Sequence, residues 1–183
     1  MPKIKILSDS TCDLSAELVE KYEIGLIPLY INLGGRVLPD GVSVSPDDIY
    51  AYVEKTGELP GTIASSIEDF RKAFQTYRDQ GYEVICHTIS SDMSCSFQNA
   101  RIAAQEVDGV YVVDSRNLSS GVGHVVINAA IMARQAVLAK GKDPVGTDGD
   151  AQAAAAALCP VDGNGGATIH ITPFPLEKNP YPR

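Results

Sequence analysis

An apolar run that stops at a cluster of hydroxyl side chains and is followed by a helical pattern is the feature that most constrains this chain. Its clearest copy begins at residues 84–89, which have the length and apolar character of a buried strand. A serine-rich loop follows at residues 90–96, and helical periodicity begins at about Ser94. A strand, a loop and a helix in this order predict a parallel sheet covered by its crossover helices.

The same alternation of apolar runs and helical patterns extends over most of the sequence. The expected strands are residues 3–7, 24–33, 84–89 and 109–113. The expected helices are residues 16–22, 49–55, 94–107 and 121–140, with another that begins at Ser66 and continues through Tyr77. We therefore expect an α/β fold, a mainly parallel sheet flanked by helices, over residues 1–143.

Residues 144–183 differ in composition from the rest of the chain. Glycines, an alanine run at residues 153–157 and prolines near the end replace the periodic apolar pattern. We expect this segment to be an atypical tail, either of low complexity or truncated, that is ordered weakly or only by contact with the main domain.

Hydroxyl-rich loops follow or precede several of the expected elements, at residues 8–11, 62–66, 90–96 and 115–120. In parallel sheets, ligands bind outside the carboxyl ends of the strands, where such loops meet. A helix N-terminus beside such a loop offers unpaired N–H groups and the positive end of a dipole. The pattern therefore suits an oxyanion and leaves open whether it is a carboxylate or a phosphate.

The charge of the chain argues against nucleic acid as a partner. The formal net charge is −8, and Lys and Arg are scattered singly, so the sequence has no basic stripe to contact a phosphate backbone. No apolar run approaches the roughly 20 residues of a transmembrane helix, and the N-terminus has no apolar core of signal-peptide length.

The four cysteines show neither CxxC nor another metal-type spacing; they are Cys12, Cys86, Cys95 and Cys159. We expect free thiols in a reducing compartment, and hence a cytoplasmic protein without a bound metal.

Several motifs together resemble the DegV family of bacterial fatty-acid-binding proteins. They are residues 8–14 (SDSTCDL), 27–29 (IPL), 40–41 (DG), 59–62 (LPGT) with Phe70, 89–100 (ISSDMSCSFQNA) and 113–123 (VDSRNLSSGVG). Their order and spacing cover residues 3 to about 140. Each motif alone is weak, but jointly they are specific.

The resemblance implies a protein that buries a long-chain acyl tail between two domains and holds the carboxylate with hydroxyl groups of the first. The carboxylate-binding threonine and serine of the family fall on Thr62 and Ser94. Supporting groups would come from the neighbouring loops, at Ser10, Thr11, Ser91, Cys95 and Ser119. In part of the family, the fatty acid is presented to a separate ATP-dependent kinase subunit for phospholipid synthesis. The resemblance thus implies a carrier with no catalytic residues and no cofactor.

The sequence departs from the family pattern at three places. Cys95 stands where the family usually has glycine after the serine, which adds a side chain where backbone approaches ligand. Residues 63–65 replace a more polar, proline-containing run. The second domain is missing, because residues 144–183 do not resemble its beginning.

Other interpretations of the same residues remain open. Thr62 and Ser94 are also typical helix caps, and Asp9 and Asp114 are expected to order the loops by accepting backbone hydrogen bonds. Met93 and Phe97 fit either an acyl tunnel or core packing.

Enzymatic alternatives are a small hydrolase or a phosphotransferase that uses the same loops, and a further alternative is a non-binding remnant. A Ser94 nucleophile lacks the G-x-S-x-G context. His87 falls within a strand, His124 within a helix and His170 in the tail, so a catalytic triad is not expected. The sequence contains neither of the glycine-rich phosphate-binding motifs, G-x-x-x-x-G-K-[ST] and G-x-G-x-x-G, so it gives no support for nucleotide binding.

Overall fold

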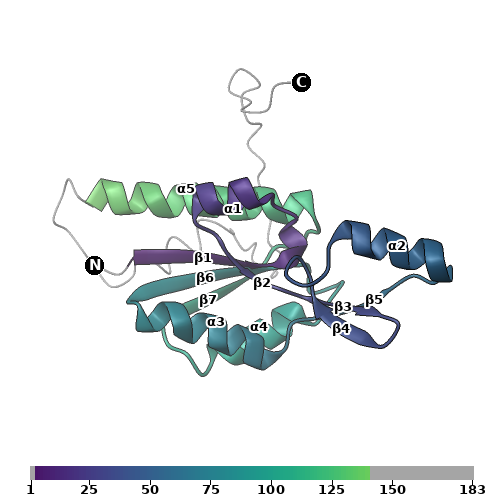
Figure 1. Cartoon of the computed structure of the whole chain (residues 1–183). Coiled ribbons are helices and arrows are strands. Elements are labelled where there is room, and N and C mark those ends of the chain that lie inside the picture. Colours follow the sequence, from purple (N-terminus) through teal and green to yellow (C-terminus); the bar gives the residue numbers. More distant parts are fainter. Residues whose placement is uncertain (1–2, 141–183) are drawn as a thin grey trace, which may run out of the picture.

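A four-stranded parallel sheet forms the centre of the protein, in a computed structural model that describes residues 3–140 and the side chains of residues 3–135. Its strands lie in the order β2, β1, β6, β7 (Figure 1). Their bounds are Lys3–Asp9 for β1, Gly25–Ile27 for β2, Tyr82–Thr88 for β6 and Val110–Asp114 for β7. All neighbouring pairs are parallel, so the carboxyl ends of the four strands lie at one edge of the sheet.

Helices cover both faces of this sheet, as Figure 1 shows. On one face lie α1 (Ala16–Tyr22) and α5 (Ser120–Lys140), and on the other lie α3 (Ile67–Asp79) and α4 (Ser96–Ala104). Successive side chains of β1 point to opposite faces: Ile6 packs with Val122 and Val126 of α5, and Leu7 packs with Phe70 and Phe74 of α3. The predicted α/β fold, a parallel sheet flanked by helices, is therefore confirmed.

A second sheet lies beyond the carboxyl edge of the first, together with α2 (Pro46–Thr56) (Figure 1). It is antiparallel, in the order β4, β3, β5, and its strands are Tyr30–Leu33 for β3, Arg36–Pro39 for β4 and Gly61–Ile63 for β5. The single strand predicted at residues 24–33 is therefore wrong. The strand breaks at Pro28, which has no N–H for a sheet ladder. Gly34 and Gly35, both with positive φ, close the hairpin that follows.

The ends of the helices follow the capping residues closely. Ser45 with Asp48, and Ser66 with Asp69, form complete capping boxes at the starts of α2 and α3. The helix predicted at 94–107 is shorter, Ser96–Ala104, and a short 3-10 helix (Ser10–Cys12) follows β1. No helix within residues 3–140 has both the length and the apolar character needed to cross a membrane. The prediction for residues 144–183 lies outside the described residues.

Substitution of Ser66 by alanine is expected to lower the free energy of unfolding by about 1 kcal/mol. The Ser66 hydroxyl accepts a 3.1 Å hydrogen bond from the Asp69 N–H and donates a 2.7 Å bond to the Asp69 carboxylate. Urea denaturation measures the change, with Ser43→Ala at an exposed turn as the control. Equal stability of the two variants would contradict the role of the cap.

Candidate functional site

Asp9 joins the end of β1 to the loop after β6. Its carboxylate accepts a 2.9 Å hydrogen bond from the Ile89 N–H and a 2.5 Å bond from the Thr11 hydroxyl. The side chain is fully buried. Burial raises the pKa of the Asp9 carboxyl, and its hydrogen bonds to Thr11 and Ile89 oppose that shift. The expected structural role of this residue is confirmed.

Asp114 makes the corresponding connection from β7. One carboxylate oxygen accepts hydrogen bonds from the N–H of Ser91 (3.1 Å) and of Arg116 (3.0 Å). The backbone adds a 3.0 Å bond from the Ser90 N–H to the Asn117 carbonyl. The loops after β6 and β7 are thus fixed to each other, and the expected role of Asp114 is also confirmed.

Ser94 lies at the end of the loop after β6, immediately before α4. Its hydroxyl accepts a 3.2 Å bond from the Ser96 N–H and lies 3.0 Å from the Ser96 hydroxyl. Ser94 therefore satisfies one of the unpaired N–H groups at the helix start. The N-cap position of α4 is nevertheless Cys95, whose side chain makes no cap hydrogen bond, so Ser94 is not the cap that the sequence interpretation expected. When Ser96 donates between the two hydroxyls, the Ser94 proton is left for an acceptor outside the loop.

Thr62 lies in a strand and not in the loop that the sequence predicted. It pairs with Ile31 of β3 across the second sheet, and its side chain is exposed. The cap of the next helix is Ser66, so the interpretation of Thr62 as a helix cap is wrong. An isolated three-residue strand has no periodicity of its own, and only the pairing with β3 makes it extended.

Two hydrogen bonds connect the segment after Thr62 to the rest of the molecule. The Ser65 hydroxyl donates a 2.8 Å bond to the Pro28 carbonyl, between β2 and β3. The Asn99 side-chain amide, on α4, donates a 2.8 Å bond to the Ser65 carbonyl. Thr62 and Ser94 therefore belong to segments that are joined through α4.

The five supporting residues have different environments. Ser10 donates a 2.8 Å bond to Asp40 and accepts one from the Leu29 N–H, which links β1 to the second sheet. The Thr11 hydroxyl donates its hydrogen bond to the Asp9 carboxylate. Ser91 and Ser119 are half-buried, in the loops before α4 and α5, and Cys95 is exposed immediately before α4. Direct contact of these residues with a ligand stays a prediction.

Arg116 and Asn99 are polar residues of this edge to which the sequence reasoning assigned no role. The Arg116 guanidinium lies 3.2 Å from the Asp92 carboxylate and 3.4 Å from the Ser91 hydroxyl, so it also ties together the loops after β6 and β7. Arg116 has a φ of 52°. The sequence feature that could have indicated Arg116 is that it is the single basic residue in the hydroxyl-rich loop at residues 115–120.

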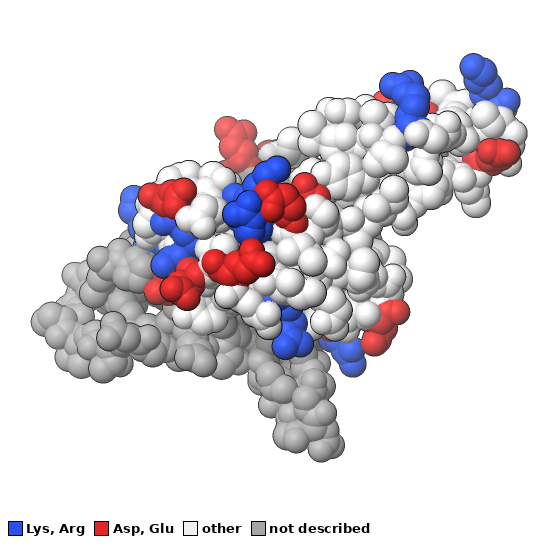
Figure 2. Space-filling view, turned by 90° about the horizontal axis from the view of Figure 1, so that it is seen from below, with Lys and Arg blue, Asp and Glu red and all other residues white. Residues whose placement is uncertain are grey.

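The surface beside these loops exposes apolar side chains. Leu59 is 85% exposed and Met93 is 60% exposed, and Ile63 and Leu118 are about half exposed. Figure 2 shows a largely uncharged area where the side of α3 and α4 meets the second sheet. Core packing is therefore the wrong interpretation for Met93, whereas Phe97 is half-buried under the guanidinium of Arg101.

The residues considered for enzymatic roles do not assemble around Ser94. His87 is completely buried in β6, and His124 is exposed on α5. Within the described residues, the Ser94 hydroxyl bonds Ser96 and no histidine. Three cysteines are free, of which Cys12 and Cys86 are buried. His170 and Cys159 lie outside the described residues.

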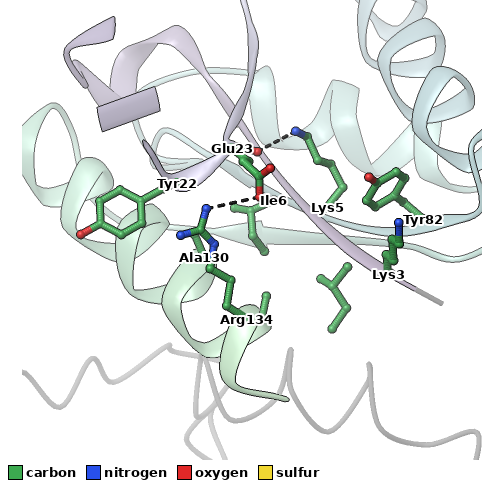
Figure 3. A pocket seen from close by; sticks show the side chains of 10 residues that line it. Lys3, Lys5, Ile6, Tyr22, Glu23, Tyr82, Ala130 and Arg134 are labelled. Atoms are coloured by element: carbon green, nitrogen blue, oxygen red, sulfur yellow. Dashed lines mark hydrogen bonds and ion pairs between the residues drawn. The ribbon is translucent and has the colours of Figure 1, made fainter. Parts of the chain in front are cut away.

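A hollow of about 490 Å³ lies at the opposite, amino end of the sheet (Figure 3). Two of the basic side chains that line it are bonded within the protein: Lys5 donates to the Glu23 carbonyl (2.6 Å), and Arg134 donates to the Lys21 carbonyl (2.7 Å) and lies 3.3 Å from the Glu23 carboxylate. These bonds hold the end of α1 against β1 and α5. The hollow contains none of the predicted site residues.

A comparison with known protein families gives one match, from residue 3 to residue 138, to the DegV family, which is described as uncharacterised. This chain belongs to the DegV family. A DegV domain-containing protein of Clostridium perfringens is 41% identical over 132 residues, which are 71% of this chain and 47% of that protein. This DegV chain spans about half the length of the curated relatives that it matches.

Solved structures agree with the family. A fatty-acid-binding DegV protein of Thermus thermophilus has a TM-score of 0.69 at 31% identity, over 85% of this chain and 52% of that one. A stearic-acid-binding protein of Eubacterium ventriosum has a TM-score of 0.68 at 30% identity, over 74% of this chain and 48% of that one. The predicted family is thereby confirmed.

Proposed function

We propose that this DegV chain binds a long-chain fatty acid at the carboxyl edge of its main sheet, with Thr62 and Ser94 holding the carboxylate. The observation that carries the proposal is the junction of the second sheet with α4, where an exposed threonine and a helix-start serine lie on two joined segments. Hydroxyl groups and the N-terminus of a helix are suitable donors for a carboxylate.

The apolar side chains beside these donors support an acyl ligand over a free phosphate. Leu59, Met93, Ile63 and Leu118 expose apolar surface at this end of the molecule. Burial of an acyl chain contributes ~0.8 kcal/mol for each fully buried CH₂, so the chain supplies most of the affinity and the carboxylate sets its orientation.

The proposal extends to the role of the whole protein. Residues 1–143 form the DegV-like N-terminal domain and supply one wall of the acyl site. The protein acts as a cytoplasmic, non-catalytic carrier that presents its fatty acid to an ATP-dependent kinase subunit. Relatives named for fatty-acid binding support the carrier role, and the free thiols of Cys12, Cys86 and Cys95 support a reducing compartment.

Native mass spectrometry of the purified chain, followed by denaturing lipid extraction, tests the carboxylate site. The wild type is expected to carry or take up stearic acid, and Thr62→Val/Ser94→Ala is expected to bind it about a hundredfold more weakly, because two hydrogen bonds to a charged group are lost. Thr76→Val/Ser43→Ala, which makes the same two side-chain changes at exposed positions outside the proposed site residues, is the matched control.

Four other results would contradict the proposal. An empty wild type that stays empty when offered fatty acids would leave a non-binding remnant. Retention of the ligand by the double variant would place the carboxylate elsewhere. Ester turnover that Ser94→Ala abolishes would favour a hydrolase, and ATP-dependent product formation would favour a phosphotransferase.

A further inference from the structure

Asn99, on α4, forms a hydrogen bond with the segment that follows Thr62. Within residues 3–135, no other α4 side chain bonds that segment. The Asn99 amide nitrogen donates a 2.8 Å bond to the Ser65 carbonyl and lies 3.8 Å from the Cys95 sulfur. Ser65 is fully buried. One side chain therefore connects the β5 segment to the first turn of α4.

The first turn of α4 is rigidly connected to Ser94. The Asn99 N–H donates a 2.9 Å bond to the Cys95 carbonyl, and the Ser96 N–H donates to the Ser94 hydroxyl. A displacement of Asn99 thus displaces the turn that carries Ser94.

The β5 segment, in contrast, is attached to a different sheet. Within the described residues, β5 pairs only with β3, and the second sheet shares no ladder with the main sheet. The hydrogen bonds of β5 therefore fix Thr62 relative to Ile31 and not relative to α4. The Ser65 hydroxyl adds a bond to the carbonyl of Pro28, which lies in the link between β2 of the main sheet and β3 of the second sheet and makes no contact with α4 through this bond.

We propose that Asn99 is the positioning residue that sets Thr62 at a fixed distance from Ser94, so that both hydroxyls reach one carboxylate. This inference rests on the proposed fatty-acid site. An amide suits the role because its two N–H groups serve the Ser65 carbonyl and the Cys95 sulfur, and because it adds no charge beside a bound anion. Asn99 itself need not touch the ligand.

The test compares stearic acid with the alcohol of the same chain length, in wild type and in Asn99→Ala. Asn99→Ala removes the hydrogen bond to the Ser65 carbonyl, so the Thr62 and Ser94 hydroxyls are no longer held together. The variant is therefore expected to bind the acid about tenfold more weakly. The alcohol has no carboxylate to be shared, and its affinity is expected to stay within about twofold. Gln98→Ala, an exposed side chain on the same helix, is the matched control.

A merely structural role gives a different result, because damage to the fold weakens the acid and the alcohol equally. Equal losses, or no loss, would overturn the proposal. A double-variant cycle adds a second criterion: Thr62→Val is expected to cost much less in the Asn99→Ala background than in wild type, whereas full additivity would also overturn it.

Hydrogen exchange on the ligand-free protein separates this inference from the proposed function. Asn99→Ala is expected to speed exchange in the peptide that contains residues 61–66, relative to Gln98→Ala, whether or not a fatty acid binds. If the wild type binds neither lipid, the proposed function fails. Unchanged exchange in that peptide would overturn the proposal that Asn99 positions the segment that follows Thr62.

Discussion

Replacement of His87 by leucine is expected to remove the loss of stability that this buried histidine causes between pH 6.5 and about 4, while changing stability little at neutral pH. His87 is the second-last residue of β6 and has no exposed surface. Neither ring nitrogen has a hydrogen-bond partner among the described residues, so leucine, which is of similar size, sacrifices no bond there.

The expected direction follows from the pKa of the imidazole. Burial disfavours the charged ring and lowers the pKa of His87 from 6.5 to about 4, an effect that the nearby backbone of Leu7 partly opposes. The unfolded chain therefore takes up a proton at a higher pH than the folded one. Stability is complete above pH 6.5 and falls as the pH drops toward 4, by about 3 kcal/mol in all.

Urea denaturation at several pH values measures this loss as the difference between wild type and His87→Leu. The difference isolates His87 from Asp9, whose pKa is raised by burial and which therefore changes stability in the opposite direction. His124→Gln controls for removal of an exposed histidine. Parallel pH profiles of wild type and His87→Leu would show that acid acts through other groups.

Asp9→Ala is expected to lower the free energy of unfolding by about 3 kcal/mol and to disorder the loop that carries Ser94. The substitution leaves the Ile89 N–H and the Thr11 hydroxyl without their acceptors, which are the two oxygens of the buried Asp9 carboxylate. Because the loop after β6 begins at Ile89, fatty-acid binding is expected to weaken as well.

Asp9→Asn separates the charge of this residue from its hydrogen bonds. Asparagine keeps the shape and one acceptor oxygen, so its cost is expected to lie between those of wild type and Asp9→Ala. Asp108→Ala, at an exposed loop position, controls for the loss of an acid. Thermal denaturation and lipid binding are measured on the same variants. If Asp9→Ala is as stable as Asp108→Ala, the Asp9 carboxylate does not stabilise the loop after β6.

Local patterns in the sequence were sufficient for the main sheet and its helices. Residues 84–89 are mostly apolar and are buried on both faces, which is typical of a central parallel strand, and Ser66 with Asp69 specifies a helix start within four residues. The hydroxyl-rich segments after β1, β6 and β7 lie at one edge as predicted, because the carboxyl ends of parallel strands meet there, whereas the segment at residues 62–66 begins within β5.

The second sheet could not be predicted in the same way. Pro28 divides one apolar run into two strands that belong to different sheets, and β5 is extended only because β3, about thirty residues earlier in the chain, pairs with it. Strand pairing is a long-range interaction that leaves little trace in a three-residue segment.

Periodicity, capping and motif spacing are local properties, so they were sufficient to predict the α/β class, the family and the residue types at the candidate site. Which of those residues work together depends on packing between distant parts of the chain. Only in the fold do Asp9 and Asp114 hold one loop from two neighbouring strands, and only there does Asn99 connect Ser94 to the segment of Thr62. These hydrogen bonds join residues far apart in the chain, so their geometry exists only once the two sheets and α4 have packed.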